Sequence, residues 1–278
     1  MTASAPLRVV LGTAGLGLAL AGCGAGRDVA PPIVERPSLT VQRPAPAATI
    51  RRTRTFGRSS TGRRLRVVER GTRGSDRSVL VVGCIHGTEC AGSAITRHLV
   101  RGPAPRGAKL WIVPDLNPDG RAAGTRLNGR GVDLNRNFPS QWRPLQRRGD
   151  PQYSGPRPLS EPESRAIARL IRARRPRVTI WFHQPQAVVR AWGPSVPAAR
   201  RYARLAEVPF RRIRWPNGTA PNWQNHRFPG TSSFVAELPV GELDGAAARR
   251  YAAAARELAT TLSARQAEAG HRRVDNGP

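Results

Sequence analysis

The chain has 278 residues, which suits one large domain with a short leader better than two full domains. Its formal net charge is +28, and Lys109 is the only lysine among its 46 basic residues. The arginines are spread along the whole chain and accompany no nucleic-acid-binding motif, which argues against a nucleic-acid-binding protein. A surface of this charge is instead expected to meet anionic lipid head groups or cell-wall polymers.

The N-terminal segment has the pattern of an export signal. Arg8 precedes an apolar stretch, Val9 to Ala21, that is too short to span a bilayer as a helix of the mature protein. The stretch ends in Leu20-Ala21-Gly22-Cys23, which resembles a bacterial lipobox. Residues 1–22 are therefore predicted to be a lipoprotein-type signal peptide and Cys23 to be lipidated, which would attach the protein to the membrane. The alternative is an ordinary export signal and a secreted protein with an unmodified Cys23.

Composition divides the rest of the chain into three parts. Residues 23–52 are rich in proline, alanine and arginine and lack apolar periodicity, which is typical of an extended tether. Residues 53–268 are predicted to form one domain. Residues 269–278 are a polar tail.

Short apolar runs alternate with helical patterns in the predicted domain. The runs predict buried strands at Ser78–Ile85, Lys109–Pro114, Arg177–Phe182 and Ser233–Ala236. Helices are predicted at Ala91–Val100, Glu161–Arg174, Pro197–Ala206 and Asp244–Glu268. Ser160 and Glu163 are predicted to form a capping box at the start of the second helix. The alternation predicts an α/β domain with a mixed, mostly parallel twisted sheet and helices on both faces.

Metal-ligating residue types lie at the ends of two of these strands. His86 follows the first strand, Glu89 comes three residues later, and His183 ends the third strand. Because sites in open α/β sheets lie at the carboxyl ends of strands, these side chains are expected to converge. Two histidines and one carboxylate leave Zn²⁺ a fourth position for water, which is the arrangement of a catalytic site. A nearby carboxylate must still take the proton from that water.

Two cysteines flank this motif. Cys84 and Cys90 form an even pair once Cys23 is set aside, and the predicted compartment is oxidising. The sequence leaves open whether they form a disulfide that braces the loop or remain two buried thiols.

Five segments together, in this order and spacing, resemble the M14-type zinc carboxypeptidase superfamily over roughly residues 55–265. They are His86-Gly87-Thr88-Glu89, Asn117-Pro118-Asp119-Gly120, Gly131-Val132-Asp133-Leu134-Asn135-Arg136-Asn137-Phe138-Pro139, His183 and Glu237-Leu238-Pro239. The resemblance implies one zinc bound by His86, Glu89 and His183, with Glu237 as general base. It also implies that Asn135 and Arg136 bind the terminal carboxylate of a peptide substrate, and that Arg126 stabilises the oxyanion, with Arg121 and Arg130 as rivals for that role.

The spacing is most similar to that of the bacterial murein peptide amidases of this superfamily, which cleave the bond between γ-D-glutamate and diaminopimelate. A wall-derived peptide is therefore the expected substrate. One departure is that no tyrosine lies between Tyr202 and Glu237, where digestive members carry a mobile one. Trp223 and His226 are candidates for lining the pocket, although a packing role for the aromatic residue fits the sequence equally well.

Two other functions remain open from the sequence. One is a zinc amidohydrolase of the aspartoacylase or desuccinylase kind, which also uses a His-x-x-Glu motif and a later histidine. The other is a basic wall-binding lipoprotein without catalytic activity.

Overall fold

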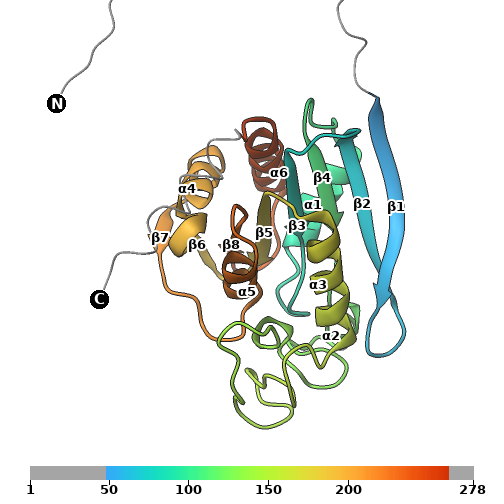
Figure 1. Ribbon diagram of the computed structural model, residues 1–278, viewed down its shortest axis with the longest axis vertical. Coiled ribbons are helices and arrows are strands. Elements are labelled where there is room, and N and C mark those ends of the chain that lie inside the picture. The colour runs from blue at the N-terminus through green and yellow to red at the C-terminus, as the bar shows by residue number, and fades with distance from the viewer. Residues whose placement is uncertain (1–47, 263–278) are drawn as a thin grey trace, which may run out of the picture. The chain divides into compact units, whose positions relative to one another are not determined.

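The computed structural model describes residues 48–262 (Figure 1). The predicted signal peptide, Cys23, nearly all of the predicted tether and the polar tail 269–278 lie outside the described residues. None of the helices among residues 48–262 is long and apolar enough to cross a membrane.

One eight-stranded sheet forms the centre of the domain, with the strand order β1-β2-β4-β3-β5-β8-β6-β7. The strands are β1 (Thr49–Arg58), β2 (Arg64–Thr72), β3 (Ser78–Val82), β4 (Lys109–Val113), β5 (Val178–His183), β6 (Gln186–Ala191), β7 (Phe210–Arg212) and β8 (Ser232–Pro239). Four of the seven strand pairings are parallel, namely β3 with β4, β3 with β5, β5 with β8 and β6 with β7. The prediction of a mixed, mostly parallel sheet is confirmed.

Helices cover both faces of this sheet. They are α1 (Gly92–Arg101), α2 (Pro118–Ala122), α3 (Pro162–Arg174), α4 (Val196–Leu205), α5 (Ala220–Arg227) and α6 (Gly245–Thr260), with short 3₁₀ turns η1 (Leu134–Arg136) and η2 (Gly193–Ser195). Neighbouring residues of a strand point to opposite faces. Phe182 of β5 packs on Tyr202 of α4 and Tyr251 of α6, whereas Trp181 packs on Phe138, which contacts Trp223 of α5. The two faces of β5 are therefore covered by different segments, α4 and α6 on one face and Phe138 with α5 on the other.

The four predicted strands correspond to β3, β4, β5 and β8, which lie in the interior of the sheet. Strands β3 and β5 are buried along their whole length, which explains their continuous apolar sequences. The edge strand β1 was not predicted, and its first residues, Thr49 to Arg52, fall inside the predicted tether. Most of its side chains are exposed and several are arginines, so the segment lacks an apolar pattern. Charged residues on an edge strand disfavour pairing with other chains.

Two predictions about helix ends are wrong. Glu161, not Ser160, is the N-cap of α3, and no side chain caps this helix. The Ser160 hydroxyl contacts Asn137 and Glu161, and Glu163 accepts a hydrogen bond from the main chain of Ser60 instead of bonding back to the N-cap. At the other end of the chain, α6 ends at Thr260, well before Glu268, where threonine hydroxyls bond the carbonyl of Glu257.

Candidate active site

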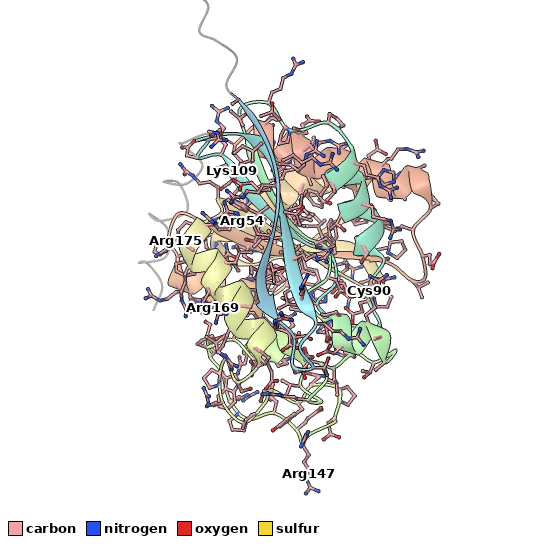
Figure 2. The ribbon with its side chains drawn as sticks, turned by 90° about the vertical axis from the view of Figure 1, so that its right-hand side faces the viewer. Arg54, Cys90, Lys109, Arg147, Arg169 and Arg175 are labelled. Carbon is pink, nitrogen blue, oxygen red and sulfur yellow. A yellow bond between two sulfur atoms is a disulfide. The ribbon has the colours of Figure 1, made fainter. Side chains whose placement is uncertain are left out.

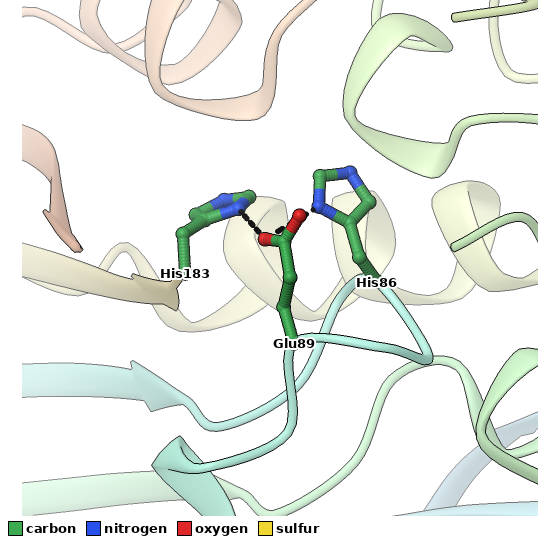
Figure 3. Close-up of side chains that lie close together, drawn as sticks. All are labelled: His86, Glu89 and His183. Carbon is green, nitrogen blue, oxygen red and sulfur yellow. Dashed lines mark hydrogen bonds and ion pairs between the residues drawn. The ribbon is translucent and has the colours of Figure 1, made fainter. Parts of the chain in front are cut away.

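Three potential metal ligands converge at the carboxyl ends of β3 and β5. His86 and Glu89 lie in the loop between β3 and α1, and His183 is the last residue of β5. Glu89 Oε2 lies 2.9 Å from His86 Nδ1 and 2.9 Å from His183 Nδ1 (Figure 3). The three ligand atoms all lie within 4.8 Å of one another. The structure thus brings together the set that the sequence pattern singled out.

The loop that holds His86 and Glu89 is braced from two sides. A disulfide joins Cys84 to Cys90 and closes the segment between them, so of the two alternatives for this pair the structure has the disulfide. Gly87 lies so close to the segment of residues 120–125 that an added Cβ would be 2.1 Å from the carbonyl carbon of Gly120. Only glycine permits this approach.

The electrostatics of the three side chains suit a divalent cation. Burial lowers the pKa of His183 to about 4, so this imidazole is neutral near pH 7. Burial acts to raise the pKa of Glu89, but hydrogen bonds with His183 and His86 outweigh it and lower the pKa. Burial likewise acts to lower the pKa of His86, but Asp133 and Glu89 together raise it. A neutral histidine, a carboxylate and a histidine between two carboxylates form a centre that attracts positive charge.

The donor set fits zinc. Both Nδ1 atoms face the same carboxylate, so a metal ion bound here would have two nitrogens and one carboxylate oxygen as neighbours. Two imidazole nitrogens and one carboxylate oxygen are the ligands of many catalytic zinc sites, in which the fourth position remains open.

Asp133 connects this centre to its surroundings, and the sequence had suggested no role for it. The side chain is fully buried, and its Oδ1 lies 2.9 Å from His86 Nε2 and accepts a hydrogen bond of 2.8 Å from the main chain of Asn135. Its Oδ2 accepts hydrogen bonds from Nε and Nη2 of Arg126 at 3.2 and 3.1 Å. One carboxylate thus orients a candidate metal ligand, an arginine and the turn that begins η1.

Glu237 lies beside His183, because these two residues pair directly in the parallel β5–β8 ladder. It is 6% exposed, and its Oε1 accepts a hydrogen bond of 3.1 Å from Nη1 of Arg190 on β6. Burial raises the pKa of Glu237, and Arg190 opposes this effect. A carboxylate with a raised pKa is a stronger proton acceptor than an exposed one.

A cavity of about 340 Å³ brings all of these groups together. Its lining consists of His86, Glu89, Arg126, Asn135, Arg136, His183, Gln184, Pro185, Gln186, Arg190, Trp215, Pro216, Thr219, Pro221, Val235 and Glu237. Among the rivals for the oxyanion role, Arg126 lines the cavity and contacts Glu89 and Asp133. Arg121 pairs with Asp115 instead, and Arg130 borders a separate pocket.

Asn135 and Arg136 also face this cavity from η1. Asn135 Oδ1 accepts a hydrogen bond from the main chain of Ala220, and its Nδ2 lies 3.4 Å from His183 Nε2. The Arg136 guanidinium contacts the carbonyl of Asn135 and the side chain of Gln152. Its pKa is lowered by burial and by repulsion from Arg126 and Arg190, so the three arginines share one electrostatic environment.

Comparison with known proteins assigns the family. The model of the zinc carboxypeptidase family matches residues 45–227. The chain belongs to the zinc carboxypeptidase family. The matched span contains His86, Glu89 and His183, whereas Glu237 lies beyond it, so the placement of Glu237 rests on the geometry of β8.

Within this family, the chain is similar to murein peptide amidase A of Escherichia coli K12, at 32% identity over 126 residues, or 41% of this chain and 52% of the relative. It is 32% identical over 195 residues to γ-D-glutamyl-L-diamino acid endopeptidase 1 of Lysinibacillus sphaericus, covering 53% of this chain and 48% of the relative. The matches thus span about half the length of these relatives. The crystal structure of murein-tripeptide amidase from Escherichia coli O157 superposes with a TM-score of 0.60 at 27% identity, covering 76% of this chain and 93% of that one.

Gln184 is a further residue of the site that sequence reasoning missed. Its Oε1 accepts a hydrogen bond from the main chain of Ala91, at the end of the ligand loop. Its Nε2 donates to the carbonyls of Pro239 and Gly241, just beyond Glu237. The side chain therefore ties the loop that holds His86 and Glu89 to the strand that holds Glu237. A glutamine directly after a predicted ligand at a strand end was the only signal for it.

Trp223 and His226, the two pocket candidates from the sequence, do not line the cavity of the metal ligands. Trp223 is 3% exposed and packs between Phe138 and Phe228, so its role is packing. His226 borders a separate pocket with Trp215 and Asn222.

Replacement of Asp133 by asparagine is expected to weaken zinc binding by about 10- to 100-fold, the usual effect of losing the partner of a metal-bound histidine. The amide has the same shape but no charge with which to orient His86 and Arg126. Competition with a chromophoric chelator would measure the zinc affinity. Asp76→Asn, which changes an exposed carboxylate, is the control. An Asp133→Asn protein with normal zinc affinity and only a lower melting temperature would reduce Asp133 to a structural role.

Proposed function

We propose that this chain is an exported, zinc-dependent metallopeptidase that hydrolyses an amide bond next to a free carboxyl terminus in cell-wall-derived peptides. The observation that supports this proposal most directly is the content of one cavity. It contains the three clustered ligands, the buried carboxylate of Glu237 and the guanidinium groups of Arg126 and Arg136.

Substrate binding is assigned to Asn135 and Arg136. The forked donors of an arginine match the two oxygens of a terminal carboxylate, and an adjacent amide adds a donor of fixed direction. Both side chains lie on η1, which Asp133 anchors to the ligand His86. A carboxylate held here would place the adjacent amide bond near the metal ligands, which explains cleavage near the chain terminus.

The reaction is assigned to residues around the metal centre. Zinc bound by His86, Glu89 and His183 would supply a Lewis acid and lower the pKa of water. Glu237 takes a proton from the attacking water and later delivers it to the leaving amine. Arg126 lies beside Glu89 and donates to the oxyanion that develops on the substrate carbonyl. The carboxylate of Asp133 keeps this arginine in position.

A wall-derived peptide is supported by the relatives and by the charge of the molecule. The relatives named murein peptide amidase and γ-D-glutamyl-L-diamino acid endopeptidase share about a third of their residues with this chain where they match. Wall peptides carry several carboxylates, and the basic side chains of this protein lie on many elements, including β1, β4 and α3 (Figure 2). Such a surface favours encounter with acidic peptides and anionic polymers.

Export is the part of the proposal that concerns the N-terminus. The signal-peptide pattern and Cys23 support an anchored lipoprotein at the outer face of the cytoplasmic membrane, or a secreted protein if Cys23 is unmodified. The disulfide between Cys84 and Cys90 agrees with an oxidising compartment. Mass spectrometry of the mature N-terminus would reveal a lipid on Cys23.

The function is tested by mass spectrometry of wall peptides incubated with the purified zinc-containing chain. We expect loss of the terminal residue from a peptide that ends in γ-D-glutamyl-diaminopimelate, and no cleavage in the presence of a chelator. N-acyl amino acids form a second substrate set. Cleavage of that set alone would indicate an aspartoacylase-type amidohydrolase, and salt-sensitive wall binding without turnover would indicate a non-catalytic lipoprotein.

A further inference from the structure

Arg190 faces the cavity from β6, and the proposed reaction leaves it without a role of its own. In the antiparallel pairing of β6 with β8, Arg190 lies opposite Val235, and Val188 lies opposite Glu237. Paired residues, and residues two positions apart on a strand, share a face of the sheet. Arg190, Val235 and Glu237 therefore point the same way, and all three line the cavity.

The guanidinium of Arg190 is only partly used. Its side chain is 18% exposed, and its Nη1 donates to Glu237 Oε1 at 3.1 Å. Its buried Nε has no hydrogen-bond partner among residues 48–262. An arginine offers five N–H donors in a planar fork that matches a carboxylate. A buried N–H without a partner is unfavourable, so a ligand oxygen that accepts from it would gain affinity.

This arginine is distinct from the one assigned to the terminal carboxylate. Arg136 approaches from η1 and is held by Asn135 and Gln152, whereas Arg190 approaches from the sheet, beside Glu237. The cavity is thus lined by guanidinium groups on two sides. A substrate with one carboxylate would pair with only one of these two arginines.

We propose that Arg190 is a specificity-determining residue that binds a second carboxylate, on the side chain of the residue that leaves. The inference rests on the proposed function and adds the residue that selects peptides ending in a diamino dicarboxylic acid. Meso-diaminopimelate has this chemistry. L-lysine has the same skeleton with a hydrogen in place of the second carboxylate. A comparison of these two residues therefore tests the contribution of the second carboxylate alone.

A different role for Arg190 makes a different prediction. If the arginine only positions Glu237, its loss slows the hydrolysis of every substrate equally, because Glu237 takes part in every turnover. If Arg190 binds the second carboxylate, its loss slows only the hydrolysis of a substrate that has this carboxylate.

The test measures kcat/KM for two peptides that differ only in ending with γ-D-glutamyl-meso-diaminopimelate or γ-D-glutamyl-L-lysine. We expect the zinc-containing wild-type chain to favour the diaminopimelate peptide by roughly 10- to 100-fold, the range for hydrogen bonds to a charged group. Arg190→Gln is expected to remove this preference by slowing that peptide alone. Arg211→Gln is the matched control, because Arg211 pairs with Arg190 on the neighbouring strand β7 but is exposed and does not line the cavity.

Each result decides the proposal. Equal slowing of both peptides in Arg190→Gln, or equal cleavage of both by the wild type, would overturn it while leaving the peptidase assignment intact. Cleavage of neither peptide by the wild type would instead overturn the proposed function and this inference with it. If Arg190→Gln does not fold, inhibition of the wild type by free diamino acids gives the second measurement. Stronger inhibition by meso-diaminopimelate than by lysine supports the proposal, and equal inhibition contradicts it.

Discussion

Glu237→Gln is expected to reduce kcat by about 10³-fold, within the usual range for loss of a general base. The glutamine side chain has the same shape and can still accept the hydrogen bond from Arg190. It cannot take a proton from water, so the loss should fall on the chemical step and leave zinc content unchanged. Steady-state kinetics on a wall peptide, together with metal analysis, would separate these two effects.

The position of Glu237 on β8 allows a close control. Glu242 follows the same strand only a few residues later, is exposed and does not line the cavity. Glu242→Gln makes the same chemical change and should leave kcat within about twofold, as expected for a surface substitution. A Glu237→Gln protein that contains zinc and keeps more than a tenth of the wild-type rate would exclude Glu237 as the base.

The strands that the sequence predicted are those buried on both faces of the sheet. Strands β3, β4, β5 and β8 each contain an uninterrupted apolar run, because both sides of these strands are covered. The four strands that were not predicted, β1, β2, β6 and β7, lie toward the edges of the sheet. Their sequences mix apolar and polar residues. The helix α5 was missed for a related reason, since it buries the amides of Asn222, Gln224 and Asn225 and has no apolar stripe. Asn225 uses its amide to bond both main-chain groups of Ser233 on β8.

Some residues of the candidate site were likewise predictable from the sequence and others were not. His86, Glu89, His183 and Glu237 were predictable because each is a chemically distinct residue at or near the end of an apolar strand. Contacts between side chains from distant segments leave no such pattern. The approach of Asp133 to His86 joins residues 47 positions apart, and that of Arg190 to Glu237 joins residues on two strands that are not consecutive in sequence. The capping-box prediction failed for the same reason, because Ser160 and Glu163 have partners elsewhere in the fold.

Removal of the metal is expected to abolish activity and lower thermal stability together. A ligand that binds only the folded chain stabilises it by about 2.7 kcal/mol when its free concentration is 100 times its dissociation constant. For a domain of this size, such a change corresponds to a melting-temperature shift of roughly 5 to 10 °C. Calorimetry of the chain with a chelator, and then with zinc restored, would show whether the shift and the activity return together.

His183→Ala tests the same centre through one ligand. His183 is 4% exposed, and its Nδ1 lies 2.9 Å from Glu89, so its loss removes one of three ligand atoms and leaves the carboxylate with His86 and Arg126. We expect zinc affinity to fall by more than the 10- to 100-fold that typically follows loss of a supporting hydrogen bond, and kcat/KM to fall to background. His226→Ala is the matched control, because this exposed histidine borders a separate pocket. A His183→Ala protein that still binds one zinc with wild-type affinity would show that the metal lies elsewhere, because a site that keeps only His86 and Glu89 lacks the third protein ligand of a catalytic zinc centre.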